Sequence, residues 1–253
     1  MAKLSFDDFY RGIWGGRWES LREAMLSEID DKDTPAGLVA PYYMDKASIE
    51  AALQLSPSEG DDILDMCAAP GGKSIVIATL LKGTGSLTSN DRSPERRERM
   101  RRAFESSLPA HWRGNIRITG HDASKWGVYE KDAYDRILLD APCSSERHVI
   151  NSPEHLSIWS PSRPKRLQAL QYSMFASAML ALRKGGILVY STCSINSGED
   201  EDIIARFMRK HPGEAEEIKI ELEGGERRDH GMIVLPDAAG GRGPLYVAKL
   251  RKI

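Results

Sequence analysis

Two of the three cysteines lie at the ends of short apolar runs, next to residues that can support thiol chemistry. Cys143 follows Asp140 by three residues, and Cys193 comes directly after Ser191 and Thr192. A thiolate can be a nucleophile, a metal ligand or half of a redox pair. No Cys-x2-Cys or His-x3-His spacing occurs, which disfavours a metal site and the usual redox motif. A nucleophile with an assisting second thiol remains, although most free cysteines are simply small, buried apolar residues.

A glycine-containing segment predicts a binding site for an adenosine-type cofactor. Residues 65–74 read Asp-Met-Cys-Ala-Ala-Pro-Gly-Gly-Lys-Ser. The small residues let the backbone approach a ligand closely, and the helix that follows offers free N–H groups. Neither Gly-x4-Gly-Lys-Ser/Thr nor Gly-x-Gly-x-x-Gly is present, so the segment alone also fits an ordinary strand-to-helix turn.

Two aspartates strengthen the prediction of a cofactor site. Asp91 lies nineteen residues after Gly72, at the end of the second predicted strand, where an acid can bind ribose hydroxyls. Asp122 ends the third predicted strand in the same way. Acids at loop starts are often turn formers or helix caps. Acids in register along one sheet edge nevertheless favour an adenosine site.

Alternating strands and helices must position these residues. The predicted strands are 62–67, 86–91, 115–120, 134–141 and 186–192, with 217–222 and 245–250 as weaker candidates. The predicted helices are 72–82, 94–106, 164–183 and 198–211. Such alternation requires right-handed crossovers and predicts an α/β fold with a mostly parallel sheet. Because one helix connects the fourth and fifth strands, they should be neighbours, with Asp140 and both cysteines at one edge.

The chain is predicted to consist of two parts. Residues 1–60 form an N-terminal helical extension, with amphipathic stretches near 18–29 and 46–55, and residues 61–253 form the catalytic domain. The composition, with 41% hydrophobic and 28% charged residues, is that of a globular chain. There is no apolar run of about 18 residues and no secretory leader. Three cysteines make no disulfide framework, so we expect a cytoplasmic, reducing location without membrane contact.

The charge is nearly balanced overall but unevenly distributed. A net charge of −2 argues against a protein whose whole surface is basic and binds nucleic acid. Residues 92–102 contain six Arg and two Glu, whereas residues 199–226 contain ten acids and four bases. The basic stretch is either a phosphate-binding surface or a helix surface with Glu–Arg pairs.

With these motifs the sequence resembles the RNA (cytosine-5)-methyltransferases of the RsmB/NOP2/Sun family. Segments 65–73, 140–144 and 191–194 resemble the cofactor loop and the two cysteine motifs of that family, and Glu-Asp-Glu at 199–201 stands where Glu-Asn-Glu is usual. The resemblance implies the class I S-adenosylmethionine-dependent methyltransferase fold, which is Rossmann-like. That fold has a mostly parallel seven-stranded sheet with helices on both faces.

The resemblance also implies a cofactor, S-adenosyl-L-methionine, and roles for individual residues. Cys193 would be the nucleophile, Cys143 would assist release of the product, and Asp91 would bind the ribose. The implied cofactor-binding residues are Cys67, Ala68, Ala69, Pro70, Gly71, Gly72, Lys73, Asp91, Arg96, Asp122 and Asp140.

Further segments point to a subgroup. Residues 42–48, 122–127 and 143–148 resemble the short members that act on mitochondrial rRNA and tRNA. The usual closing Gly-Phe-Phe is replaced by Gly-Pro-Leu-Tyr at 243–246. The 60 lead-in residues leave no room for the separate RNA-binding domain of longer members, so we expect a partner protein or a ribonucleoprotein to help the affinity for RNA. We also expect a monomer.

The chemistry of cytosine explains why such a site needs a thiolate. Adding a thiolate to C6 makes the ring enamine-like, so that C5 can attack a methyl group, and an acid at N3, a role suited to Asp140, stabilises the developing charge. The target base must be unpaired or flipped out of a helix. Basic residues could hold its phosphates, or could be ordinary surface: Arg147, His148, Arg163, Lys165 and Arg166.

Three other interpretations stay open at this point. A DNA cytosine-5 methyltransferase would use the Pro-Cys thiol, Cys143, as its nucleophile. A non-catalytic assembly factor would bind cofactor or RNA without turnover. A nicotinamide oxidoreductase is disfavoured by the missing Gly-x-Gly-x-x-Gly pattern and by the paired thiols.

Overall fold

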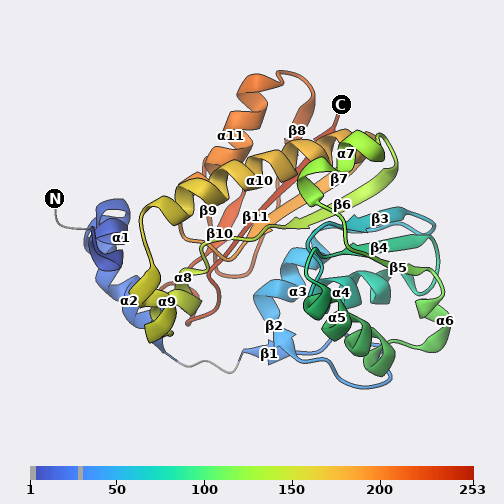
Figure 1. The fold of residues 1–253 in the computed structure, drawn as a ribbon, viewed down its shortest axis with the longest axis horizontal. Helices are drawn as coiled ribbons and strands as arrows, with labels where there is room; N and C mark the ends of the chain where they lie inside the picture. The colour runs from blue at the N-terminus through green and yellow to red at the C-terminus, as the bar shows by residue number, and fades with distance from the viewer. Residues whose placement is uncertain (1–3, 28–30) are drawn as a thin grey trace.

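The computed structural model describes residues 4–27 and 31–253 of the 253-residue chain (Figure 1). Within these residues, nine strands form one central sheet. They are β3 (Asp62–Asp65), β4 (Ser86–Asn90), β5 (Ile116–Thr119), β6 (Tyr134–Asp140), β7 (Leu182–Thr192), β8 (Ala215–Ile218), β9 (Gly225–Arg227), β10 (Met232–Val234) and β11 (Leu245–Lys252). Their order is β5-β4-β3-β6-β7-β11-β10-β9, and β8 pairs with β11 beside this path.

The five strands predicted between residues 62 and 192 make up the parallel part of the sheet. β3 pairs in parallel with β4 and β6, β4 with β5, and β6 with β7. β11 runs antiparallel to β7, β8 and β10, and β9 runs antiparallel to β10. The mostly parallel α/β sheet is therefore confirmed. It has nine strands within the described residues instead of seven, because β9 and β10, of three residues each, are too short to be predicted.

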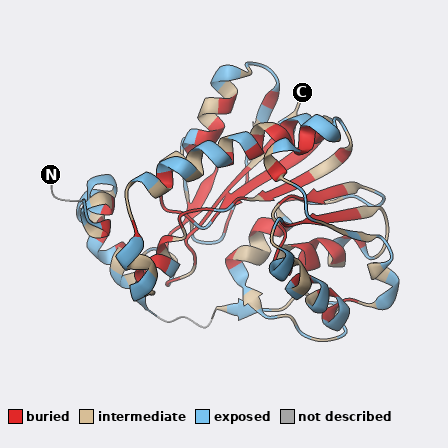
Figure 2. Cartoon of the chain, viewed as in Figure 1, coloured by how far each residue is buried: buried red, intermediate tan, exposed pale blue. Residues whose placement is uncertain are grey.

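Helices cover both faces of the sheet (Figure 1). One face packs against α7 (Trp126–Tyr129), α10 (Ser162–Ala181) and α11 (Glu201–Lys210), and the other against α3 (Lys46–Leu53), α4 (Gly72–Leu81) and α5 (Pro94–Ser107). Side chains of β7 alternate between the two layers. Leu188 and Tyr190 pack with α10, whereas Ile187 and Val189 pack on the opposite side. Covering both faces explains the continuous apolar runs of these strands, and the strands are buried along most of their length (Figure 2).

Two predicted helices begin differently from each other. Ser93 caps α5 by accepting a hydrogen bond from the Arg96 backbone N–H at 3.3 Å, as the Ser-Pro pair at 93–94 indicates. The predicted helix 198–211 instead opens with a 3₁₀ turn, η3 (Ser197–Glu199), and α11 starts only at Glu201. Asp200 breaks the helix because its backbone is non-helical, with φ −110° and ψ −109°.

The N-terminal residues contain α1 (Phe6–Trp14), the 3₁₀ turn η1 (Gly15–Arg17), α2 (Trp18–Leu26), and the two-residue strands β1 (Lys32–Asp33) and β2 (Met44–Asp45) before α3. The amphipathic stretch predicted near 18–29 matches α2, although residues 28 and 29 lie outside the described residues. Tyr10 and Trp18 belong to the same apolar cluster as α10 and β7. The extension thus shares the core of the main domain, and the boundary at residue 60 stays a prediction.

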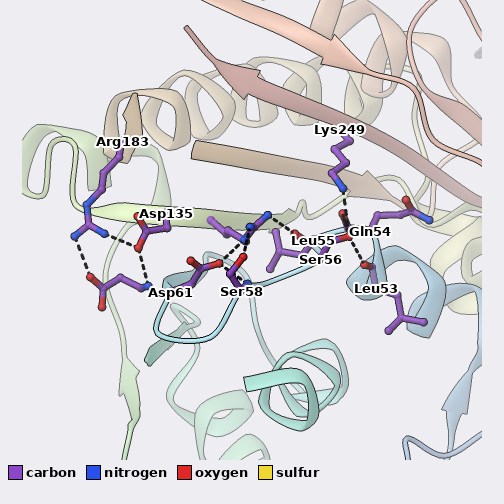
Figure 3. Close-up of polar contacts among 11 residues, drawn as sticks. Leu53, Gln54, Leu55, Ser56, Ser58, Asp61, Asp135, Arg183 and Lys249 are labelled. Atoms are coloured by element: carbon purple, nitrogen blue, oxygen red, sulfur yellow. Dashed lines mark hydrogen bonds and ion pairs between the residues drawn. The ribbon is translucent and has the colours of Figure 1, made fainter. Parts of the chain in front are cut away.

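Ion pairs hold the sheet together at the end opposite the cysteines. Arg183, at the start of β7, donates hydrogen bonds to Asp135 at 2.5 Å and to Asp62 at 2.9 Å (Figure 3). Lys249 of β11 reaches the hydroxyl of Ser56 at 3.3 Å (Figure 3). The Arg183 contacts join β7 to β6 and to β3, and the Lys249 contact joins β11 to the loop before β3, so polar contacts hold this end of the sheet together.

Three shorter helices and one further 3₁₀ turn complete the described elements. They are α6 (Ala110–Arg113), α8 (Glu146–Ile150), α9 (Pro153–Ile158) and η2 (Ala123–Lys125). Among the described residues no helix combines the length and apolar character needed to cross a membrane.

Candidate active site

The two cysteine loops leave neighbouring parallel strands. Asp140 at the end of β6 pairs in register with Ser191 of β7, so the two strands are neighbours as predicted, although α8, α9 and α10 connect them in place of the single predicted helix. The loops carry Cys143 and Cys193 to a separation of 2.9 Å between their sulfur atoms. Cys193 is exposed, whereas Cys143 is buried. The prediction that both cysteines and Asp140 lie at one edge of the sheet is confirmed.

A cavity of about 450 Å³ opens beside Cys193. Its wall includes Lys73, Asp140, Ser145 and His148. It also includes residues 243–245, which belong to the Gly-Pro-Leu-Tyr segment that stands in place of Gly-Phe-Phe. Cys143 is not part of the wall and lies behind Cys193. The volume is within the range of small-ligand pockets. A planar base placed here would therefore meet the sulfur of Cys193 first.

A second cavity, of about 270 Å³, lies over the predicted cofactor loop. Its wall is made by the end of β3, the start of α4 and the strand β2 with its flanks. The wall residues are Tyr42, Tyr43, Met44, Ser48, Asp65, Cys67, Ala68, Ala69, Pro70, Gly72, Lys73 and Asp140. Most of the predicted loop is thus brought to one cavity. Tyr42, Met44 and Ser48 are not among the predicted site residues, because no spacing pattern connects β2 with the loop.

Asp91, Arg96 and Asp122 do not line this cavity. The Arg96 guanidinium forms an ion pair with Asp91 at 3.0 Å and also donates to the backbone carbonyl of Ala69. Asp91 and Arg96 therefore support the loop through the Ala69 carbonyl, from outside the cavity wall. Asp122 accepts two hydrogen bonds from Ser124, one from its N–H and one from its hydroxyl, so it acts as a cap for η2. Direct contact of these three residues with a cofactor stays a prediction.

Lys73 and Asp140 form the boundary between the two cavities. The Lys73 ammonium donates to Asp140 Oδ2 at 2.8 Å and to the Ser48 hydroxyl at 3.3 Å, and all three residues line both cavities. Ser191 donates to the other oxygen of Asp140 at 2.8 Å. Burial lowers the pKa of Lys73, but attraction to the Asp140 carboxylate outweighs it, and the net pKa is raised. The sequence places Lys73 in the cofactor loop but gives no sign of this ion pair.

The thiols of Cys143 and Cys193 differ electrostatically. The hydrogen bond from Cys143 lowers the pKa of Cys193 against the opposing effect of burial, and Ser145 and Lys73 add to the lowering. The same hydrogen bond, together with burial, raises the pKa of Cys143. When the pair loses a proton, the loss is therefore favoured at Cys193 over Cys143. Burial also raises the pKa of Cys67, so that third thiol is not activated.

Two buried carboxylates hold the cysteine loops from opposite sides. Glu199 accepts from the Ser144 N–H and from the Gln171 amide, both at 2.9 Å. Glu146 accepts from the Ser194 hydroxyl at 2.9 Å. Each glutamate thus binds the residue that follows the other loop's cysteine. Glu146 is absent from the predicted site because an isolated acid gives no pattern, whereas Glu199 is part of the Glu-Asp-Glu motif.

The basic residues predicted near the site divide into bound and exposed ones. Arg147 donates to the carbonyls of Gly241 and Gly243 at 2.6 Å and to that of Ser27 at 2.9 Å, so its guanidinium is committed to backbone. Arg147 also lines the cavity beside Cys193, and the expectation that it holds a phosphate stays a prediction. His148 is exposed and lines the catalytic cavity.

The basic run on α5 is partly neutralised. Arg101 and Arg102 both pair with Glu98, at 2.9 and 3.1 Å, as in the interpretation of a helix surface with Glu–Arg pairs. Lys165 and Arg166 are exposed near the start of α10. Across residues 4–27 and 31–253 no group of three or more His, Cys, Asp or Glu is placed to hold a metal ion.

Comparison with known proteins places the chain in a family. A model of the 16S rRNA methyltransferase RsmB/F family matches residues 52–251. The 5-cytosine rRNA methyltransferase NSUN4 of Bos taurus is 34% identical over 236 residues, covering 85% of this chain and 60% of that protein. The mitochondrial tRNA (cytosine(34)-C(5))-methyltransferase of Danio rerio is 33% identical over 230 residues, covering 84% and 60%.

Among solved structures, the crystal structure of NSun6 from Pyrococcus horikoshii with SFG has a TM-score of 0.71 at 28% identity. The match covers 83% of this chain and 53% of that one. This chain spans about 60% of the length of the curated relatives described above. The chain belongs to the RsmB/F family of 16S rRNA methyltransferases and has the class I methyltransferase fold.

Proposed function

We propose that this protein is an S-adenosyl-L-methionine-dependent RNA methyltransferase that forms 5-methylcytosine in rRNA or tRNA. The observation that carries the proposal is the pair of sulfur atoms 2.9 Å apart, next to a Lys73–Asp140 boundary shared by two cavities. We assign the cavity beside Cys193 to a flipped base and the cavity over residues 65–74 to the cofactor. The named functions of the relatives, on rRNA and on tRNA, support the substrate class.

The cofactor cavity has the close backbone approach that such a ligand needs. Gly71 has φ +115°, and a Cβ there would lie only 3.0 Å from Met100 Cγ. A Cβ on Gly72 would lie 3.1 Å from Met44 Cε, a residue of the cavity wall. The positive φ of Gly71 therefore favours glycine, whereas a Cβ on Gly72 would require the flexible end of Met44 to shift. When bound, S-adenosylmethionine would supply an electrophilic methyl group, and the free N–H groups of α4 would face it.

The protein's part in the reaction begins at Cys193. Its thiolate electron pair would form the sulfur–C6 bond, and the C5=C6 π pair would move to C5, which becomes nucleophilic. Both oxygens of Asp140 already accept hydrogen bonds, so the proton available at this boundary is on Lys73. We therefore assign stabilisation at N3 to the Lys73–Asp140 pair acting together.

Release of the product would depend on Cys143. Once Cys193 is a thioether, it no longer accepts the Cys143 proton, and Cys143 would give that proton to solvent water and become a thiolate base. Removal of the C5 proton would return the electron pair to the C5=C6 bond and expel Cys193 as a thiolate. The DNA-type assignment would require Cys143 to face the cavity, but Cys143 is buried behind Cys193.

The proposal includes a monomer in a reducing, cytoplasmic environment that obtains part of its RNA affinity from a helper protein or a ribonucleoprotein. The net charge of −2 and the committed guanidinium of Arg147 support weak binding to naked RNA.

The test is incubation of the protein with methyl-labelled S-adenosylmethionine and bulk RNA or DNA, followed by nucleoside analysis. Labelled 5-methylcytidine from RNA alone is expected. Label in DNA only would favour the DNA-type assignment, and no label in either, with retained cofactor binding, would favour an assembly factor.

A further inference from the structure

The hydroxyl of Ser145 lies between the two catalytic sulfur atoms. Ser145 Oγ is 3.2 Å from Cys193 Sγ and 3.4 Å from Cys143 Sγ. Both distances are within hydrogen-bond reach for sulfur, and Ser145 lines the catalytic cavity beside Cys193. Neither the motif nor the cysteine spacing assigns this residue a role.

The backbone of Ser145 is held in a conformation that serine rarely adopts. Its φ of 51° and ψ of 55° are left-handed, a region that favours glycine. Ser145 precedes α8 at the N-cap position, yet its side chain makes no capping hydrogen bond. Left-handed backbone at a non-glycine residue occurs often at functional sites. Here it accompanies a hydroxyl that faces the sulfur atoms instead of the helix end.

The hydroxyl proton has three acceptors within reach. Besides the two sulfur atoms, the backbone carbonyl of Cys143 lies 3.4 Å from Ser145 Oγ. An ionised acceptor forms the stronger hydrogen bond, and Cys193 is both the nearest acceptor and the thiol whose ionisation its surroundings favour. The proton of Ser145 is therefore directed to Cys193 in the resting enzyme.

We propose that Ser145 is a catalytic residue whose hydroxyl stabilises the thiolate of Cys193 before attack and that of Cys143 after it. The inference rests on the proposed function for its second half. During attack the Cys193 electron pair becomes the sulfur–C6 bond, so that sulfur ceases to be an ionised acceptor. The hydroxyl then turns to Cys143, which is 3.4 Å away and becomes the remaining thiolate when it loses its proton. Ser145 itself gains and loses no proton.

The test measures the reactivity of each thiol separately, without RNA or cofactor. Alkylation by iodoacetamide is followed across pH in the full-length protein, and the three cysteines are resolved by mass spectrometry. Trypsin places them on separate peptides, 47–73, 137–147 and 185–206. In Ser145→Ala the midpoint for Cys193 is expected to rise by about one pH unit, which means about tenfold less thiolate below the midpoint.

Ser145→Gly is the matched control for backbone strain. Glycine removes the same hydroxyl but relieves the left-handed conformation, whereas alanine retains that strain. Equal shifts in both variants would support the hydrogen bond. An unchanged midpoint in either variant would overturn the proposal, because a shift in alanine alone would come from the loop. Single-turnover adduct formation on RNA should slow about tenfold at pH 7 in both. Absence of RNA product in the wild type would instead count against the proposed function.

Discussion

The hydroxyl of Tyr10 donates a hydrogen bond of 2.6 Å to the carboxylate of Glu146, across 136 residues of sequence. Tyr10 belongs to α1 and is fully buried, and Glu146 begins α8, three residues after Cys143. The same Glu146 oxygen accepts from Ser194, next to Cys193. The N-terminal helix is therefore connected through one carboxylate to both cysteine loops.

Replacing Glu146 with Gln should change how stability depends on pH. Burial, followed by repulsion from Glu199, raises the pKa of Glu146 to about 8. Its pKa in the unfolded chain is about 4.3, so between these values the folded state binds more protons. This stabilising contribution is complete below the unfolded pKa and is lost as pH rises through about 8. Urea unfolding from pH 5 to 9 should show a smaller decline in Glu146→Gln than in the wild type. An equally steep decline would contradict the assignment.

The Tyr10→Phe substitution tests the long-range contact without changing the shape of the core. The ring stays in place against Trp18 and Trp159, but Glu146 loses one of its donors. We expect the free energy of unfolding to fall by about 1 kcal/mol, the value of a typical buried hydrogen bond. Denaturant unfolding provides the measurement.

Tyr172→Phe is the control for Tyr10→Phe, because the described contacts of Tyr172 are made by its ring, with Arg206, Lys210 and the apolar core. It should leave stability within about 0.5 kcal/mol of the wild type. Equal losses in the two variants would show that the Tyr10 contact contributes nothing specific.

Asp91→Ala should weaken binding of S-adenosylmethionine by roughly 1–3 kcal/mol, the scale of a lost hydrogen bond to a charged group. The ion pair with Arg96 gives a second reason for the loss, since Arg96 also holds the Ala69 carbonyl of the cofactor loop. Calorimetry on the folded variant measures the effect. Affinity equal to the wild type would refute the role of Asp91 at the ribose.

The chemistry at the sheet edge could be predicted because it follows from local patterns. Parallel strands joined by helices must bring their carboxyl ends to one edge, so Asp140, Cys143 and Cys193 meet wherever their strands are neighbours. The cofactor loop is likewise continuous in sequence. For these residues, the position at a strand end in the sequence is enough to predict the position in the fold.

The residues that support the site could not be predicted, because their partners are distant in sequence and leave no periodic signal. The contact of Glu199 with Ser144 spans 55 residues. The commitment of Arg147 to carbonyls near residue 242 depends on how the C-terminal strands return to the sheet. Side chains that form hydrogen bonds with buried polar groups meet their partners only in the folded chain, so the sequence alone does not identify them.

Replacing Cys193 and Cys143 by Ala should have different effects on turnover and on the covalent RNA adduct. In the proposed mechanism Cys193→Ala removes the attacking sulfur, so both turnover and the covalent RNA adduct are lost. Cys143→Ala leaves the attack possible, because Lys73 and Ser145 still favour the thiolate of Cys193. Elimination lacks its base, however, and protein joined to RNA should accumulate as a shifted band on a denaturing gel that nuclease collapses.

One gel with the wild type, both single variants and the double variant separates the three interpretations of the thiol pair. The DNA-type assignment predicts the reverse pattern, with an adduct that persists in Cys193→Ala and disappears in Cys143→Ala. Two structural cysteines would give no adduct in either variant, and only a loss of stability from a small cavity. Cys193 is exposed in the catalytic cavity, whereas Cys143 is buried behind it. The geometry therefore predicts the adduct in Cys143→Ala alone, and an adduct in Cys193→Ala would refute the assignment of the nucleophile.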